Sequence, residues 1–229
     1  MLYYILFDTS LTAQEAVIRF LITIFVLMIS LSVHEFSHAL TAHIMGDSTP
    51  KAMGRLTLNP FKHLDTKGFI FFMLLGVGWA KPVPINPLKF KKFKKGIRLV
   101  SISGILANFF LGLLAAGIYA ILLVTVGFET VAMGYIETVL IYFMLVNSFL
   151  ALFNLLPIYM FDGYNFITSF MKTENKFIKF SVRNGFKIII GIILLGFLTE
   201  IMFGFDIFSA YLSLLFDFVY LPISFIGVL

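Results

Sequence analysis

Residues 16–45 read AVIRFLITIFVLMISLSVHEFSHALTAHIM, an apolar run long enough to form one membrane helix. About 20 residues cross the apolar core of a bilayer as an α-helix, so this run spans it with residues to spare. Arg19 interrupts the run near its start, and four ionisable residues interrupt it near its end: His34, Glu35, His38 and His43. Ionisable side chains are costly inside a membrane, so their presence there indicates a functional site.

The rest of the chain is similarly apolar. Its 229 residues are 60% apolar and 13% charged, whereas a soluble domain has about 45–50% and about 25%. One core of this size cannot bury such an excess, which predicts a single membrane-embedded unit over residues 1–229. We expect its core at about residues 16–170 and C-terminal membrane segments at about 188–229. The absence of cysteine excludes disulfides, thiolate metal sites and thiol nucleophiles.

Apolar runs of sufficient length predict an all-α polytopic membrane protein. We expect about five to six membrane segments, namely four to five crossings plus a short re-entrant hairpin, with a small β element near the cytoplasmic face. After the first run, crossings are predicted at Leu99–Phe128, at Ile136–Phe161 and twice within Ile188–Leu229, with a break at Gly204-Phe-Asp206. The run Gly68–Trp79 is too short for a straight crossing and is predicted to form the hairpin.

Lysine and arginine are concentrated in two stretches of the chain. Sixteen of the seventeen basic residues lie in residues 51–98 and 172–187, and the connections near 127–135 and near 204 contain none. The positive-inside rule therefore places the two basic stretches in the cytoplasm and the N-terminus outside. The basic run Lys89–Lys95 is interpreted as an anchor on anionic lipid rather than as a nucleic-acid patch.

The spacing of His34 and His38 predicts a metal site. Residues four apart on a helix differ by about 40° around its axis and about 6 Å along it, so both imidazoles project from one face. Glu35 lies about 100° further round, where its carboxylate can reach a metal-bound water but not the metal. His-Glu-x-x-His on a helix is the zinc-binding arrangement of metalloproteases, with the glutamate as general base. The alternative, histidines that only satisfy one another in a helix bundle, would place three ionisable groups in the membrane without a function.

A catalytic zinc ion needs a third protein ligand, and Asp162 and His63 are the candidates. His43 lies about 180° from His34 around the helix and is predicted to pack against other residues instead. Pro157 and the glycine after Asp162 are predicted to bend the third long run and to direct this aspartate inward. Because the loop charges make the first and third runs both end at the cytoplasmic side, the aspartate is expected at a depth similar to that of the histidines. The ion is then expected inside the membrane, on the order of 12 Å below the cytoplasmic end of the first helix.

Four further elements follow the His-Glu-Phe-Ser-His motif along the chain. They are Gly54-Arg-Leu-Thr-Leu-Asn59-Pro60-Phe-Lys-His63-Leu-Asp65, then Gly78-Trp-Ala-Lys-Pro-Val-Pro-Ile-Asn-Pro87, then Ser103-Gly104 with Asn108, and last Asn154-Leu-Leu-Pro157 with Phe161-Asp162-Gly163. In this order, over about residues 30–170, they resemble the site-2 protease family of intramembrane zinc metalloproteases. The compact prokaryotic branch of that family, which has no extra regulatory domain, is the most similar.

The resemblance implies a role for each candidate residue. His34, His38 and Asp162 would hold one Zn²⁺ ion, and Glu35 would be the catalytic base. Asn154 matches an asparagine that could contact the substrate or a developing oxyanion. Its alternative role is to cap the helix before the proline. His63 is not expected to be a ligand; it could contact a ligand, contact the substrate, or lie at the interface after the Asn59-Pro60 turn.

The resemblance also implies a substrate, namely a transmembrane segment of another protein that is cut within the bilayer of a prokaryotic plasma membrane. Such regulated intramembrane proteolysis requires the segment to become extended, and Gly54–Leu58 is predicted to be an edge strand to which it could add. No nucleic-acid partner is expected. One alternative is a divalent-metal transporter, although the chain has no second histidine-bearing membrane run or matching repeat. The other is an inactive relative that binds membrane segments without cutting them.

Overall fold

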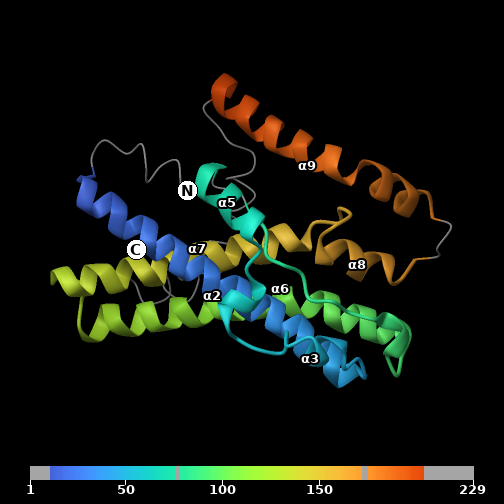
Figure 1. Ribbon diagram of the computed structural model, residues 1–229. Helices are drawn as coiled ribbons and strands as arrows, with labels where there is room; N and C mark the ends of the chain where they lie inside the picture. Colours follow the sequence, from blue (N-terminus) through green and yellow to red (C-terminus); the bar gives the residue numbers. More distant parts are fainter. Residues whose placement is uncertain (1–10, 76–77, 172–174, 204–229) are drawn as a thin grey trace.

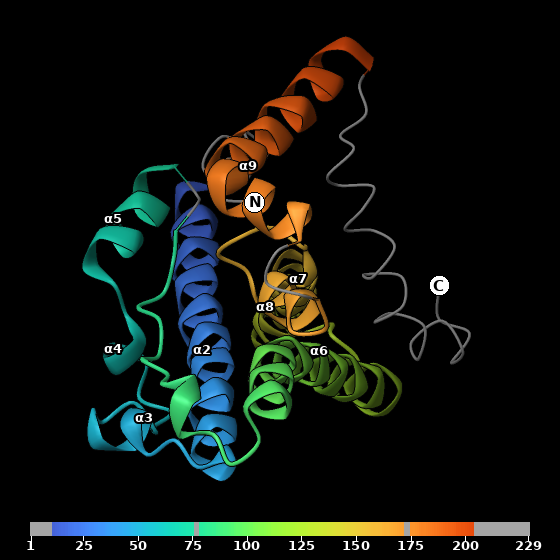
Figure 2. The same cartoon turned by 90° about the vertical axis from the view of Figure 1, so that its right-hand side faces the viewer.

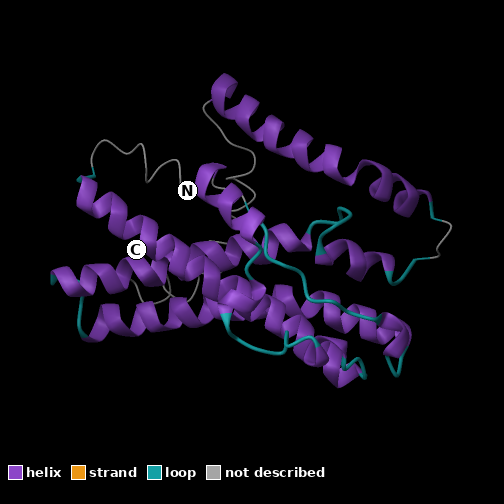
Figure 3. Ribbon diagram, in the orientation of Figure 1, coloured by secondary structure: helices purple, strands orange, loops and turns teal. Residues whose placement is uncertain are grey.

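The computed structural model describes residues 11–75, 78–171 and 175–203, and in these residues it consists of helices and loops without a strand (Figure 1, Figure 3). Three of the described helices are long and apolar enough to cross a membrane: α2 (Ala13–Met45), α6 (Phe93–Thr125) and α7 (Val131–Leu155). They coincide with the first three predicted runs, so the helical class is confirmed. The total number of crossings stays a prediction, because the expected break at residues 204–206 and the last crossing lie outside the described residues.

Helix α2 is capped at both ends. The Thr12 hydroxyl accepts a hydrogen bond from the Glu15 N–H at 3.3 Å, and the Glu15 carboxylate accepts one from the Thr12 N–H at 2.8 Å. Gly46 ends the helix with a φ of 113°, and its N–H donates to the carbonyl of His43. A Cβ on this glycine would lie 3.0 Å from the carbonyl oxygen of Lys89. The caps therefore define a 33-residue helix that carries the predicted metal site in its last third.

The helices α2, α6 and α7 pack together as the core of the molecule (Figure 2). Between α6 and α7 the buried residues are mostly small, namely Ala115, Ala116 and Ala120 with Leu140 and Met144. Between α2 and α7 they are Val26, Tyr142, Val146 and Leu150. In lipid, small residues let helix backbones approach closely and gain van der Waals contact. This packing fixes the rotation of the helices that supply the site.

The chain between α2 and α6 forms short helices and loops: α3 (Thr49–Ala52), α4 (Pro60–His63), α5 (Thr66–Leu75) and the 3-10 helix η1 (Pro87–Lys89). The expected edge strand at Gly54–Leu58 is a turn and bend that pairs with no strand in the described part of the chain. The reason is that the buried guanidinium of Arg55 donates to carbonyls of two neighbouring segments, which holds this stretch as a loop. Among the described residues there is one isolated antiparallel β-bridge, between Leu64 and Ala80.

The predicted hairpin at Gly68–Trp79 begins as α5 and returns beside it (Figure 1). The rings of Phe71 and Trp79 are 5.4 Å apart. A Cβ on Gly68 would lie 2.2 Å from the carbonyl oxygen of Trp79, an approach that only glycine permits. The two ends of the segment therefore meet, and its position relative to the membrane stays a prediction.

Helix α7 ends at Leu155, six residues before the end of the predicted run at Phe161. Pro157 has no N–H and forces the residue before it into an extended conformation, so Leu156 has a ψ of 134°. A new helix, α8, spans Asp162–Thr168, and α9 spans Lys176–Phe203. The expected bend is therefore a break, and Asp162 is the first residue of a new helix rather than the end of the old one.

Candidate metal centre

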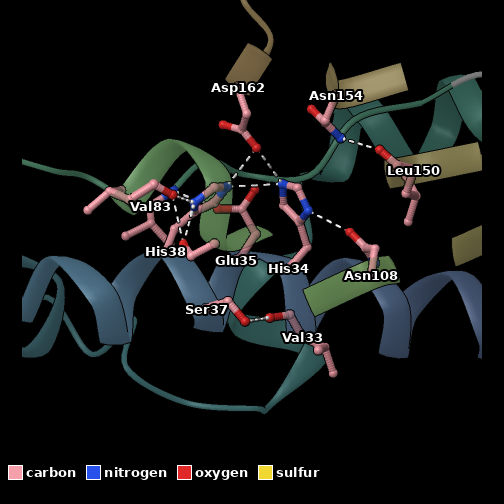
Figure 4. A network of polar contacts seen from close by, with 12 residues as sticks. Val33, His34, Glu35, Ser37, His38, Val83, Asn108, Leu150, Asn154 and Asp162 are labelled. Atoms are coloured by element: carbon pink, nitrogen blue, oxygen red, sulfur yellow. Dashed lines mark hydrogen bonds and ion pairs between the residues drawn. The ribbon is translucent and has the colours of Figure 1, made fainter. Parts of the chain in front are cut away.

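Two histidines and one aspartate direct their side chains toward one point (Figure 4). His34 and His38 lie on the buried side of α2, each 6% exposed, and their Nε2 atoms are 3.0 Å apart. Asp162 places Oδ2 3.2 Å from Nε2 of His34 and 3.0 Å from Nε2 of His38. Of the described residues, these three form a group whose ligand atoms could hold one metal ion. They are the three residues that the sequence nominated as metal ligands.

The other nitrogen of each ring faces an oxygen that can only accept a hydrogen bond. Nδ1 of His38 lies 2.8 Å from the carbonyl oxygen of Val100, and Nδ1 of His34 lies 2.6 Å from Oδ1 of Asn108. Because neither oxygen carries a proton, each Nδ1 must carry one. A neutral ring then directs the lone pair of Nε2 toward the common point.

With both rings neutral, three acceptor atoms converge on one point: Nε2 of His34, Nε2 of His38 and Oδ2 of Asp162. Oδ2 of Asp162 is buried and has no hydrogen-bond partner among the described residues. Lone pairs so close together repel one another unless a cation lies between them. Ligand atoms about 2.0–2.1 Å from a tetrahedral ion lie about 3.3 Å apart, close to the separations of 3.0 to 3.2 Å found here. Two imidazoles and one carboxylate fit a zinc ion with one coordination position left open.

Helix α6 approaches the two rings at Gly104. A Cβ on this residue would lie 2.6 Å from Cε1 of His34 and 2.6 Å from Nε2 of His38. Val100, Gly104 and Asn108 are four residues apart, so they share one face of α6. On that face, Val100 and Asn108 each provide a hydrogen-bond acceptor for one ring, and Gly104 between them leaves the space that the rings occupy.

Glu35 lies beside the two imidazoles but outside the converging group (Figure 4). Its side chain is largely buried, and Oε2 accepts a hydrogen bond from the N–H of Val83 at 2.9 Å. Val83 stands between Pro82 and Pro84, neither of which has an N–H, so it is the donor of this tripeptide. The bond fixes the carboxylate next to the metal ligands, where a general base is needed.

Three other predicted residues lie outside the converging group. His63 is 2% exposed, and its Nε2 lies 2.8 Å from the carbonyl oxygen of Thr57. His43 also lies apart from the group. The amide of Asn154 donates to the carbonyl of Leu150 at 3.0 Å, within its own helix (Figure 4). Both roles suggested for Asn154, the helix cap and the substrate contact, stay predictions.

Sequence reasoning missed three groups that support the site: Ser30, Asn147 and the N–H of Val83. Asn147 donates to the Ser30 hydroxyl at 2.9 Å and accepts from Asn108 at 2.7 Å. The signal available for these side chains is a polar residue inside an apolar run, which is weaker than that of an ionisable residue. The backbone N–H of Val83 leaves no such signal.

Comparison with known proteins agrees with this geometry. The model of the family described as "Peptidase family M50" matches residues 22–197. A protein of Bacillus subtilis (strain 168) named "Putative zinc metalloprotease YwhC" is 42% identical over 145 residues, which are 62% of this chain and 65% of that protein. The chain thus covers slightly less than two thirds of this relative. No solved structure matches the chain significantly. Because the family model spans well over half of its length, the chain belongs to peptidase family M50, the site-2 protease family, and is an integral membrane protein.

Proposed function

We propose that this protein is an intramembrane zinc metalloprotease, a metalloendopeptidase that hydrolyses peptide bonds in or near transmembrane segments of other proteins. The observation that carries the proposal is the convergence of the side chains of His34, His38 and Asp162 on one point, with Glu35 held beside them. Membership of a peptidase family and the name of the relative support the same chemistry.

The residues of the site have different roles in hydrolysis. His34, His38 and Asp162 would hold the ion through Nε2, Nε2 and Oδ2. When bound, zinc supplies Lewis-acid chemistry: it makes water a better nucleophile and polarises the substrate carbonyl. Glu35 would take the proton from the attacking water on its carboxylate and pass it to the leaving amine. The N–H of Val83 keeps that carboxylate in place, because it engages one of the two oxygens at 2.9 Å.

The distribution of charge supports an orientation for this site. Sixteen of the seventeen basic residues lie in residues 51–98 and 172–187, so we place those stretches in the cytoplasm and the N-terminus outside. The metal ligands on α2 and α8 then lie toward the cytoplasmic side of the bilayer of a prokaryotic plasma membrane. The partners of the protein are the lipid bilayer and a transmembrane substrate, without a nucleic acid.

The substrate must be unwound before it is cut. A membrane helix engages its carbonyls in its own hydrogen bonds, so the scissile peptide becomes accessible only when that segment is extended. Segments with helix-destabilising residues near the cytoplasmic end are therefore the best substrates, because less energy is needed to extend them.

The test is to reconstitute the protein in liposomes with single-span proteins that carry a tag at each end. Wild type should release both tagged halves, whereas Glu35→Gln should abolish cleavage while zinc content stays near one ion per chain. Glu129→Gln is the matched control, since Glu129 is exposed in the loop between α6 and α7. Cleavage by Glu35→Gln at the wild-type rate would contradict the mechanism. Metal uptake into the liposomes without any cleavage would favour a transporter, and binding of the segments without cleavage would favour an inactive relative.

A further inference from the structure

Three fully buried polar residues from three helices form a hydrogen-bonded chain that ends at His34. Ser30 on α2, Asn108 on α6 and Asn147 on α7 are each 0% exposed. The amide nitrogen of Asn147 donates to the carbonyl of Phe143 at 2.8 Å and to the Ser30 hydroxyl at 2.9 Å. The amide nitrogen of Asn108 donates to Oδ1 of Asn147 at 2.7 Å and to the carbonyl of Ser30 at 3.2 Å. Oδ1 of Asn108 is left to face Nδ1 of His34 at 2.6 Å.

Backbone carbonyls give this chain a single direction. The carbonyls of Phe143 and Ser30 can only accept, so each must be met by an amide nitrogen. If either asparagine amide were turned round, its oxygen would face a carbonyl oxygen, and a buried donor and acceptor would both lose their partners. Water cannot make up the loss, because the asparagines are fully buried between membrane helices. Asn108 must therefore present its oxygen, and not its nitrogen, to His34.

We propose that Asn108 is a positioning residue for the metal, and that Ser30 and Asn147 orient it. The oxygen of Asn108 holds the proton of His34 on Nδ1, which keeps the lone pair of Nε2 directed at the ion. The inference rests on the proposed function for the identity of the ion, but it concerns zinc affinity and not peptide cleavage. His38 differs, because its Nδ1 faces the backbone carbonyl of Val100, which no side-chain substitution removes.

The test compares two substitutions of Asn108 in the full-length, detergent-solubilised protein. Zinc affinity is measured by competition with a chelator of known affinity. Asn108→Leu removes the acceptor and should weaken zinc binding by about 10- to 100-fold, as losing the hydrogen-bond partner of a metal-bound histidine typically does. Asn108→Asp loses both donor bonds of the amide, and its second oxygen faces the acceptors of Ser30 and Asn147, but it keeps an oxygen for Nδ1 of His34, so it should bind zinc more tightly than Asn108→Leu. Ser148→Ala, next to Asn147 on α7, is the control, and zinc affinity should not change.

A second measurement reports the tautomer itself. In metal-free protein labelled with ¹⁵N-histidine, the ring nitrogens of the four histidines can be followed by NMR. Wild type and Asn108→Asp should show His34 protonated on Nδ1, whereas Asn108→Leu should show a mixture of tautomers. Unchanged zinc affinity in Asn108→Leu, or equal losses in the Leu and Asp variants, would overturn the proposal and leave these residues a structural role. Wild-type protein that cleaves nothing but shows these affinity differences would contradict the protease and not this inference.

Discussion

The ligands on α2 and the ligand on α8 are held in different ways. His34 and His38 belong to a long capped helix, and α6 provides an acceptor for each ring. Asp162 opens a helix of seven residues, and the loop before it contains Met160 with a φ of 99°. The pair of histidines is therefore arranged by the packing of two long helices, whereas the position of the aspartate depends on a strained loop and on the contacts that hold that loop.

Two contacts hold the loop before Asp162. The N–H of Tyr159 donates to the hydroxyl of Ser181 at 2.9 Å, and Ser181 on α9 is 1% exposed. At the other end, a Cβ on Gly163 would lie 2.2 Å from the carbonyl oxygen of Leu155, so α8 lies directly against the end of α7. The aspartate is therefore positioned by its neighbours in the chain and by α9, and its carboxylate contacts the two histidines through Oδ2.

The largest effect is expected from Gly104→Ala, which disturbs the contact of the two histidine rings with α6. The added methyl group would lie 2.6 Å from His34 and from His38, so the rings or α6 must move. We expect zinc affinity to fall by at least about 100-fold, the upper end of the effect of losing a ligand's hydrogen bond. Overpacking should also lower the free energy of unfolding by about 1–3 kcal/mol. Zinc competition and thermal unfolding measure the two effects.

The matched control is Gly117→Ala on the same helix. A Cβ on Gly117 has nothing within 4 Å, so the substitution adds a better helix former without a clash. It should leave zinc affinity unchanged. Equal zinc affinity in the two alanine variants would show that the rings do not lie against α6 as described here.

The pairing of His34 and His38 could be predicted from the sequence, but the hydrogen-bonded residues that hold the His34 ring could not. His34 and His38 share a face because the helical period places them there, and α2 has that period without interruption. Asn108, Asn147 and Ser30 come from three helices, and their contact depends on how each helix is rotated in the core. A single sequence contains no measure of that rotation.

The aspartate side was predicted less completely. Asp162 could be nominated because an acid at the end of an apolar run is costly without a function. The sequence suggested a bent helix, but Pro157 ends α7 and a separate helix begins at the aspartate. The loop at residues 54–58 failed as a strand for a comparable reason, since the contacts of Arg55 with distant carbonyls override its local β propensity.

A smaller effect is expected from Ser181→Ala, which weakens the support of the aspartate. The substitution removes the acceptor of the Tyr159 N–H, and a lost hydrogen bond of this kind costs about 1 kcal/mol. If the whole cost falls on the metal-bound form, zinc affinity drops by about five-fold. The NMR signals of His34 should keep the Nδ1-protonated tautomer, because the histidine side is untouched.

Asn184→Ala is the control for Ser181→Ala on the same helix. The side chain of Asn184 donates to the carbonyl of Phe180 within α9, so its loss should not alter zinc affinity. A change in the tautomer of His34 on substitution of Ser181 would show that the histidines and the aspartate are coupled and not held separately.

The smallest effect is expected from Met160→Gly, which tests whether the strained backbone at this residue positions Asp162. A non-glycine residue with a φ of 99° costs about 1–3 kcal/mol, and glycine adopts this φ freely but adds about 0.5–1 kcal/mol of backbone entropy to the unfolded chain. Met160 is 67% exposed, so little packing is lost. The net gain of about 1 kcal/mol should raise the melting temperature by about 2–4 °C, whereas Met160→Ala keeps the strain and should give no rise.

If Met160→Gly raises the melting temperature and leaves zinc affinity unchanged, the strain is incidental, and the contacts of Tyr159 and Gly163 alone position Asp162. If zinc affinity falls while the melting temperature rises, the strained conformation itself holds the aspartate against the histidines.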